Sequence, residues 1–266
     1  MKGSQLITLD FLKAYGACAE GRREFERVFP DGGEYQQVLD RCADEDRMDF
    51  AQWLMKVCGP SDDVRTFDED FDEPDKNIAF AGTLYFKKGA NVRRILAGCG
   101  IKAGGGIEAG EGIEAGCGIE AGWGIEAGCG IKAGWGIEAG RGIEASCGIK
   151  AGRGIEAGGG IEAGEGIEAG YGIEAGWGIE AGCGIKAGCG IEAGWGIEAG
   201  WGIKAGWGIE AGEGIEAGRG IEAGCGYGIF SGLAVKIADW PQYAVVTAKT
   251  KPDNLISGHW KELESC

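Results

Sequence analysis

Isoleucine recurs at every sixth position from Ile101 to Ile221, which makes 21 units of the form G-I-[EK]-A-G-x. Successive residues of a strand point to opposite sides, so the isoleucine and alanine of each unit share one side and the charged residue takes the other. A helix would spread a six-residue period around its whole surface. One unit is too short to bury its apolar side alone, whereas stacked units share a continuous core. The pattern therefore predicts a β-solenoid.

The lysines of the repeat indicate how many units make one coil. Lys132, Lys150, Lys186 and Lys204 are separated by 18, 36 and 18 residues, and only Lys102 departs from this series. The series of variable residues also recurs nearly unchanged after 54 residues, which is a whole number of 18-residue coils but not of 12-residue coils. We therefore expect triangular coils of three units, with seven coils in the repeat.

Three-unit coils place nearly all the glutamates of the repeat on two flat faces. One face carries Glu108, Glu126, Glu144, Glu162, Glu180, Glu198 and Glu216, and the next carries Glu120, Glu138, Glu156, Glu174, Glu192 and Glu210. The third face mixes Glu114, Glu168 and Glu222 with four lysines. Coils lie about 4.8 Å apart, and like charges at this spacing repel by about 1 kcal/mol per neighbouring pair even at the dielectric constant of water.

The variable residue between the two glycines is expected on the edges of the prism. Trp, Arg and Glu cannot all fit inside a thin core, and a buried unpaired charge is prohibitive. The edge tryptophans are Trp123, Trp135, Trp177, Trp195, Trp201 and Trp207. Positive φ is expected at the glycine before isoleucine, because the glycine after alanine is replaced once, by Ser146. Gly208→Val should then damage the fold more than Gly200→Ser.

The segments around the repeat differ in composition. Residues 1–60 place apolar side chains at helical spacing and predict a three-helix head, with Thr8 capping its first helix. Its expected core is Phe11, Leu12, Phe25, Val28, Phe29, Val38, Leu39, Phe50, Trp53 and Leu54. The remaining parts are an acidic linker (61–76), strands that lead into the repeat (77–97), the solenoid (98–226) and a β-rich cap (227–266). Alternation of Leu233, Val235, Ile237, Val245 and Val246 predicts strands in that cap.

The repeat resembles the hexapeptide-repeat left-handed β-helix, in which an aliphatic and a small residue point into a triangular prism. The resemblance covers about half of the chain and implies the architecture, including a left-handed coil. The chain is also similar to phage and bacterial proteins with tandem Gly-Ile-Glu-Ala-Gly blocks behind a short helical head. The predicted fold class is thus mainly β, a solenoid with a small N-terminal helical domain and a β-rich C-terminal cap.

Charge and targeting signals narrow the class of partner. The net charge of the 266-residue chain is −16, and residues 98–226, with 8 basic and 19 acidic side chains, hold −11 of it. Such a surface repels nucleic acid and attracts basic proteins. The N-terminus lacks the features of a signal peptide and no segment is long and apolar enough to cross a membrane. A cytoplasmic protein is expected, with its 11 cysteines reduced.

Catalysis is not expected. Many hexapeptide-repeat proteins are acyltransferases that use a histidine between two subunits, but the single histidine here, His259, lies outside the coils. The repeat cysteines lack a CxxC pair or a histidine partner, which argues against a metal site. These cysteines are Cys99, Cys117, Cys129, Cys147, Cys183, Cys189 and Cys225. Cys129 and Cys147 should stack within reach of a disulfide, although small edge filler is the simpler interpretation. No cofactor is implied.

Two functions of different kinds are favoured, and acyl transfer stays a third, lesser alternative. The first is a non-enzymatic binding protein whose acidic faces engage a basic or nucleic-acid-binding protein, as a nucleic-acid mimic. A phage or mobile-element inhibitor of host defence, of the anti-CRISPR or anti-restriction kind, would act this way in the host cytoplasm. The second is a scaffold or fibre component in which the tryptophan edges join subunits into a homo-oligomer, since aromatic anchors carry much of the energy of protein interfaces. Direct nucleic-acid binding is opposed by the glutamates. Solubility alone is the simplest role for the ladders.

Overall fold

Each Ile-Glu-Ala or Ile-Lys-Ala triplet of the repeat forms a three-residue strand. Strand β7 is Ile101–Ala103 and each following strand starts six residues later, up to β26 at Ile215–Ala217 and the shorter β27 at Ile221–Glu222. Isoleucine and alanine are buried and the charged residue between them faces outward. Each strand from β7 to β24 pairs in parallel with the strand 18 residues later, as Ile119 does with Ile137, while β25 and β26 pair with β28 and β29 of the C-terminal segment. The predicted three-unit coil is therefore confirmed.

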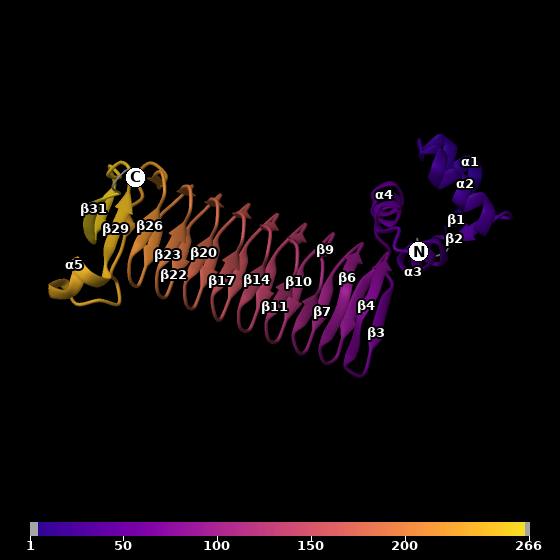
Figure 1. Ribbon diagram of the computed structural model, residues 1–266, viewed down its shortest axis with the longest axis horizontal. Coiled ribbons are helices and arrows are strands. Elements are labelled where there is room, and N and C mark those ends of the chain that lie inside the picture. The colour runs from indigo at the N-terminus through magenta and orange to yellow at the C-terminus, as the bar shows by residue number, and fades with distance from the viewer. Residues whose placement is uncertain (1–4, 264–266) are drawn as a thin grey trace.

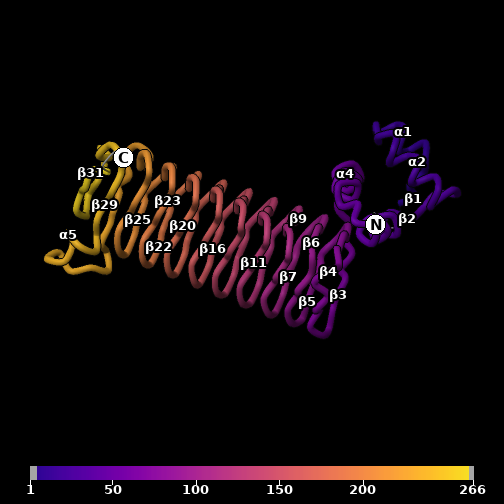
Figure 2. The backbone as a smooth tube through the Cα atoms, in the orientation of Figure 1, coloured from indigo at the N-terminus to yellow at the C-terminus, as the bar shows by residue number. Residues whose placement is uncertain are grey.

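The computed structural model describes residues 5–263 and shows a rod with a helical head at one end (Figure 1). The first four residues of the expected head and the last three of the expected cap lie outside this range. Along one face the sheet has 11 strands, one for each turn, so the rod has about 11 turns rather than seven. At about 4.8 Å per turn its length is roughly 50 Å. Figure 2 shows the regular winding of these turns. The left hand of the coil stays a prediction.

Three faces and three edges are named as follows. The first face contains β7 and every third strand after it, the second face contains β8 (Ile107–Ala109) and its successors, and the third contains β9 (Ile113–Ala115) and its successors. Edge 1 carries residues 99 to 207, edge 2 carries 105 to 213 and edge 3 carries 111 to 219, each at intervals of 18. Edge 2 separates the first and second faces.

The acidic run 61–76 is not a linker, which corrects the expectation from its composition. Its residues lie in β3 (Val64–Phe67) and β4 (Phe71–Phe80), which pair with β5 (Thr83–Phe86) and β6 (Ala90–Ala97). Phe67 stacks on Phe86 inside the first turns at 4.8 Å between ring centroids. The acids find partners one turn later: Asp68 pairs with Lys87 at 2.6 Å, and Asp72 accepts a hydrogen bond from Asn91 at 2.8 Å. Pairing between turns thus builds solenoid strands in this segment although it lacks the hexapeptide period.

The head contains four helices rather than three. They are α1 (Leu9–Ala14), α2 (Ala19–Val28), α3 (Tyr35–Asp44) and α4 (Met48–Cys58), and a short antiparallel pair joins β1 (Leu6–Ile7) to β2 (Gly33–Glu34). The Oγ1 of Thr8 accepts a hydrogen bond from the amide of Phe11 at 3.1 Å, as expected for a cap. Five of the expected core residues are buried, namely Leu12, Phe25, Val38, Leu39 and Leu54; the other five are only partly buried.

The head docks where two outward positions of the third face become apolar. Leu96 pairs in register with Glu114 and Ala79 pairs with Leu96, yet both are buried and join the core of the head. Gln36 of α3 donates to the carbonyl oxygen of Ala79 at 2.9 Å, and Gln52 of α4 donates to Glu114 at 2.6 Å. The change from glutamate to Leu and Ala at the outward positions explains why the head covers only the first turns.

The two glycines around each variable residue do not follow the expectation of positive φ at the glycine before isoleucine. None of the repeat glycines from 100 to 224 has φ in the left-handed region. A Cβ on Gly200, after alanine, would lie 2.2 Å from the carbonyl oxygen of Gly182 in the preceding coil. A Cβ on Gly208, before isoleucine, would lie 3.3 Å from that of Gly228. The glycine after alanine is therefore the strict one, and the reason is contact between coils.

The C-terminal segment continues the solenoid, and only part of its alternating sequence forms strands. Strands β28 (Ile229–Phe230), β29 (Val245–Ala248), β30 (Leu255–Ser257) and β31 (His259–Glu262) extend the faces, and Val245 and Val246 lie in β29 as predicted. Leu233 and Val235 belong to a loop and Ile237 to a short 3-10 helix (Ile237–Asp239), followed by α5 (Trp240–Tyr243). Leu233 and Ile237 are exposed, so their alternation does not mark a strand.

Candidate protein-binding surface

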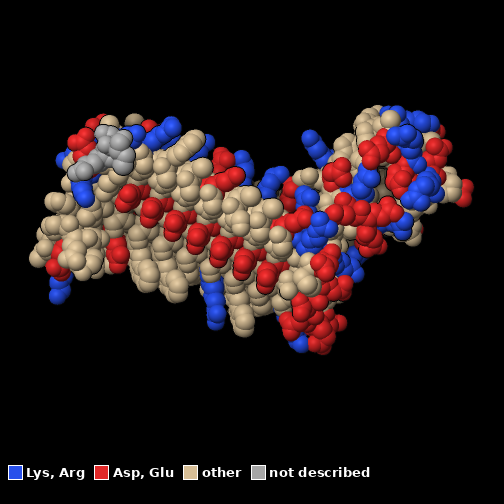
Figure 3. Space-filling model, viewed as in Figure 1, with Lys and Arg blue, Asp and Glu red and all other residues tan. Residues whose placement is uncertain are grey.

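Glutamates form two ladders on the first and second faces. On the second face Glu126 lies in register between Glu108 and Glu144, and on the first face Glu138 lies between Glu120 and Glu156. All 13 glutamates assigned to these faces from the sequence occupy them, with 7 on the second face and 6 on the first. Figure 3 shows an acidic row along the rod over β11, β14, β17 and β20. Partner binding by these residues stays a prediction.

The tryptophans stand on the edges and are solvent-exposed. The exposed fraction ranges from 51% at Trp207 to 59% at Trp123, which agrees with the argument that they cannot fit inside. Trp195, Trp201 and Trp207 stand at three successive corners of the coil, on edges 2, 3 and 1. Trp177 stacks on Trp195 along edge 2, with 5.6 Å between the ring centroids. The rings thus form aromatic ridges between the flat faces.

Each face forms a shallow trough beside one edge. The trough of the second face is bounded by Trp123, Arg141, Trp177 and Trp195 of edge 2, and its floor carries the glutamate ladder from Glu108 to Glu216. The trough of the first face is bounded by edge 1, including Trp135 and Trp207. Edge 2 is the only edge with a glutamate ladder on both sides, so it combines aromatic contact area with the strongest acidic surroundings.

The third face neutralises itself through ion pairs between turns. Its outward residues follow the order Glu114, Lys132, Lys150, Glu168, Lys186, Lys204, Glu222. Lys132 contacts Glu114 at 2.8 Å, Lys150 contacts Glu168 at 2.7 Å, and Lys204 contacts Glu222 at 2.6 Å. Every lysine of this order has a glutamate as one neighbour. The contrast with the other two faces separates a balanced side of the rod from an acidic side.

Glu168 provides a test of this balance, because Lys150 and Lys186 both contact it, at 2.7 and 3.5 Å. The hydrogen bond from Lys150 lowers the pKa of the Glu168 carboxyl, and the charge of Lys186 adds to the effect. Lys150→Gln should raise this pKa toward its ordinary value in a carbon-13 NMR titration, while Lys102→Gln on the first face should leave it unchanged. The ion pair stabilises the fold above the ordinary pKa of a glutamate carboxyl, and this stabilisation is lost as pH falls. At pH 7 the free energy of unfolding of K150Q should therefore be lower than that of the wild type by less than about 1 kcal/mol. An unshifted titration in K150Q would contradict the pairing.

The repeat cysteines lie on the edges, as expected for small edge residues. The Sγ atoms of Cys99 and Cys117 lie 2.8 Å apart on adjacent turns of edge 1. Burial and the contact with Cys99 raise the pKa of the Cys117 thiol to about 11. Cys147 contacts Cys129, and burial raises its pKa too. Both shifts favour the protonated, unreactive thiol. Within residues 5–263 the seven repeat cysteines form no disulfide.

His259 is exposed in β31, in the last turn of the solenoid. Within residues 5–263, no group of three or more His, Cys, Asp or Glu side chains is arranged to hold a metal ion. No helix in this range is both long and apolar enough to cross a membrane.

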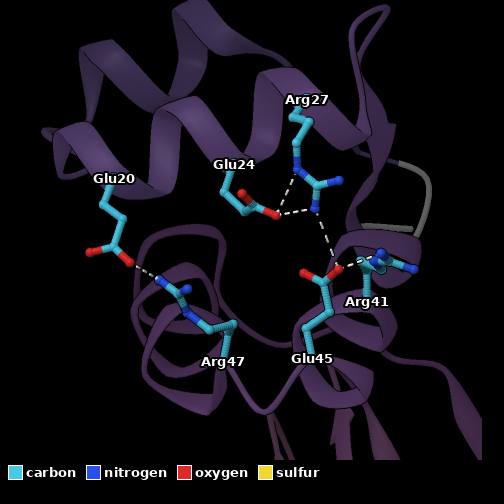
Figure 4. Close-up of polar contacts among 6 residues, drawn as sticks. All are labelled: Glu20, Glu24, Arg27, Arg41, Glu45 and Arg47. Carbon is cyan, nitrogen blue, oxygen red and sulfur yellow. Dashed lines mark hydrogen bonds and ion pairs between the residues drawn. The ribbon is translucent and has the colours of Figure 1, made fainter.

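The head contains an apolar groove that the sequence analysis missed. It lies between α2 and the α3–α4 hairpin and is lined by Leu12, Phe25, Val28, Phe29, Phe50 and Trp53, among others. Ion pairs cross its rim: Glu20 of α2 with Arg47 at 2.6 Å and Arg27 of α2 with Glu45 at 3.7 Å (Figure 4). Core and groove residues follow the same helical period, so the sequence assigned Val28 and Phe50 to a closed core.

Comparisons with known proteins concern the head alone. A family model described as the YdhT N-terminal domain matches residues 1–58, which end with α4. No curated protein and no solved structure matched the chain. The similarity therefore extends over the four helices and stops before the first strand of the solenoid.

Proposed function

We propose that this protein is a non-enzymatic binding protein whose acidic faces engage a basic, nucleic-acid-binding protein in place of nucleic acid. The observation that supports this proposal most is the pair of in-register glutamate ladders on neighbouring faces. With one glutamate per turn on each face, the two ladders present about one negative charge per 2.4 Å of rod. Duplex DNA presents about one per 1.7 Å. The density is thus of the right order for a groove that holds nucleic acid.

The biological setting that fits this chemistry is inhibition of host defence by a phage or mobile element. Restriction and CRISPR proteins hold nucleic acid in positively charged grooves, and an acidic rod can occupy such a groove without a cofactor. The protein would then act in the host cytoplasm. The balanced third face, which also carries the head, would be turned away from the target.

A scaffold that joins copies through its edges is the second candidate, favoured by the six exposed edge tryptophans. This candidate predicts a different effect of neutralising the glutamates. Ladders on two faces oppose close packing of copies, so a scaffold should assemble better when they are neutralised, whereas a mimic should lose its target.

The test uses the variant Glu126→Gln, Glu144→Gln, Glu162→Gln, Glu180→Gln, called here the ladder variant. Immobilised wild-type protein is expected to capture nucleic-acid-binding proteins from nuclease-treated bacterial lysate, and added duplex DNA should release them. The ladder variant should capture at least tenfold less. The control removes four charges from the head at Glu26, Asp31, Glu34 and Asp44, which are exposed, and should capture normally. Equal capture by both variants, or capture that DNA does not displace, would refute mimicry.

A further inference from the structure

Five of the six edge tryptophans have a planar group stacked on them from the next turn. Arg141 lies over Trp123 and Arg153 over Trp135, both at 5.1 Å from the ring centroid, and Arg219 lies over Trp201 at 4.6 Å. Trp177 is covered by Trp195 and Trp207 by Tyr227. A planar neighbour one turn later is therefore the usual arrangement of a tryptophan on this rod.

Trp195 is the exception. The residue one turn later on edge 2 is Glu213, which is exposed and has no side-chain ion pair among residues 5–263. The Glu213 backbone is fixed, because its carbonyl oxygen accepts hydrogen bonds from Ser231 Oγ at 2.6 Å and from the Gly232 amide at 2.9 Å. The Trp195 residue is 54% exposed. On the side of the following turn, the next edge residue after Trp195 is thus a glutamate, where each of the other five tryptophans has a planar group.

The surroundings of Trp195 select a planar cation. Glu198 and Glu216 of the second face line the same trough as Trp195, and so does Tyr243 of α5. Gln242 donates to the Tyr243 hydroxyl at 3.0 Å. A guanidinium can stack on an indole and donate to a carboxylate at once, which an ammonium does less well.

The chain itself uses the two kinds of cation differently. All three arginines of the repeat stand on edges and lie over tryptophans, whereas its five lysines stand on flat faces. We propose that Trp195, Glu213 and Glu216, with Tyr243, form a binding site for an arginine side chain of the partner. This proposal deepens the function proposed above and rests on it only for the identity of the partner as a basic protein.

The experiment uses the full chain and a peptide probe, acetyl-Gly-Gly-Arg-Gly-Gly-amide, observed through the indole N–H signals of nitrogen-15-labelled protein. Trp195 is assigned by its loss in Trp195→Phe. We expect a saturable shift of the Trp195 signal with a Kd on the order of 1–10 mM, the range of one cation–π contact with a carboxylate. The matching lysine and citrulline peptides should bind at least several-fold more weakly.

Two variants decide whether the open indole face is the site. Glu213→Arg supplies an internal guanidinium, as Arg141, Arg153 and Arg219 do at other tryptophans, and should weaken peptide binding at Trp195 at least tenfold. Arg141→Glu uncovers Trp123 beside a carboxylate and should create a second shift at Trp123. Absence of the Trp195 shift, equal shifts at all six indoles, or equal binding of the citrulline peptide overturns the proposal. The ladder variant keeps Glu198, Glu213 and Glu216, so it should bind the peptide normally even if mimicry fails.

Discussion

Gly134→Ala is expected to lower the free energy of unfolding by about 3 kcal/mol, whereas Gly136→Ala should change it by less than about 1 kcal/mol. A Cβ on Gly134 would lie 2.0 Å from the carbonyl oxygen of Gly116, and one on Gly136 would lie 3.4 Å from that of Gly154. The first contact forces two coils apart along the rod, while the second is an ordinary van der Waals contact. Two glycines only two positions apart should therefore differ strongly in how well they tolerate an added methyl group.

Urea unfolding followed by circular dichroism measures both variants under the same conditions. Ser146 shows that the rod accommodates one such Cβ, so Gly134→Ala should fold with a lower midpoint rather than fail to fold. Ser146→Ala serves as the control, because it keeps the Cβ that this position already has. Equal midpoints for Gly134→Ala and Gly136→Ala would remove contact between coils as the reason for the glycines after alanine.

The ladder variant is expected to be more stable than the wild type, by up to about 4 kcal/mol at low ionic strength, although it should bind its target less well. Its four changes remove five neighbouring carboxylate pairs, from Glu108–Glu126 to Glu180–Glu198. Salt screens such pairs, with a Debye length of about 8 Å at physiological ionic strength and about 3 Å at 1 M. The gain should therefore shrink as salt is added.

Thermal and urea unfolding at several salt concentrations checks this result. Glu168→Gln is the matched control, because the same chemical change on the third face removes two ion pairs with lysines and should slightly destabilise the fold. A ladder variant that is less stable than the wild type at low salt would show that the glutamates do not repel. A gain in stability with a loss of binding would indicate that the ladders are kept for function.

The repeat allowed the core of the fold to be predicted residue by residue. Ile and Ala point inward, Glu and Lys point outward and the tryptophans stand on edges, because alternation in a strand and the size of indole leave no other arrangement. The first turns were missed because Phe67, Phe71 and Phe86 fill the core there without any hexapeptide period. The strict glycine was assigned to the wrong position, since one replacement, Ser146, was taken as evidence of tolerance.

Some features of the candidate surfaces could likewise be predicted from the sequence and others could not. The two glutamate ladders could be assigned from the sequence, since any 18-residue coil brings Glu126 beside Glu144. The uncovered face of Trp195 could not, because it depends on which residue of the next turn lies over each ring. The groove of the head depends likewise on how far α2 stands from α3 and α4.

By itself, then, the sequence determined the local structure of the repeat: strand, inward pair, outward charge and 18-residue period, all of which follow from the alternation of side chains along one short unit. Only the tertiary structure decided the length of the rod, the docking of the head on Leu96, the strict glycine and the free face of Trp195. Each of these depends on a distance between atoms of different turns or of different domains, and periodicity within one chain segment does not contain such distances.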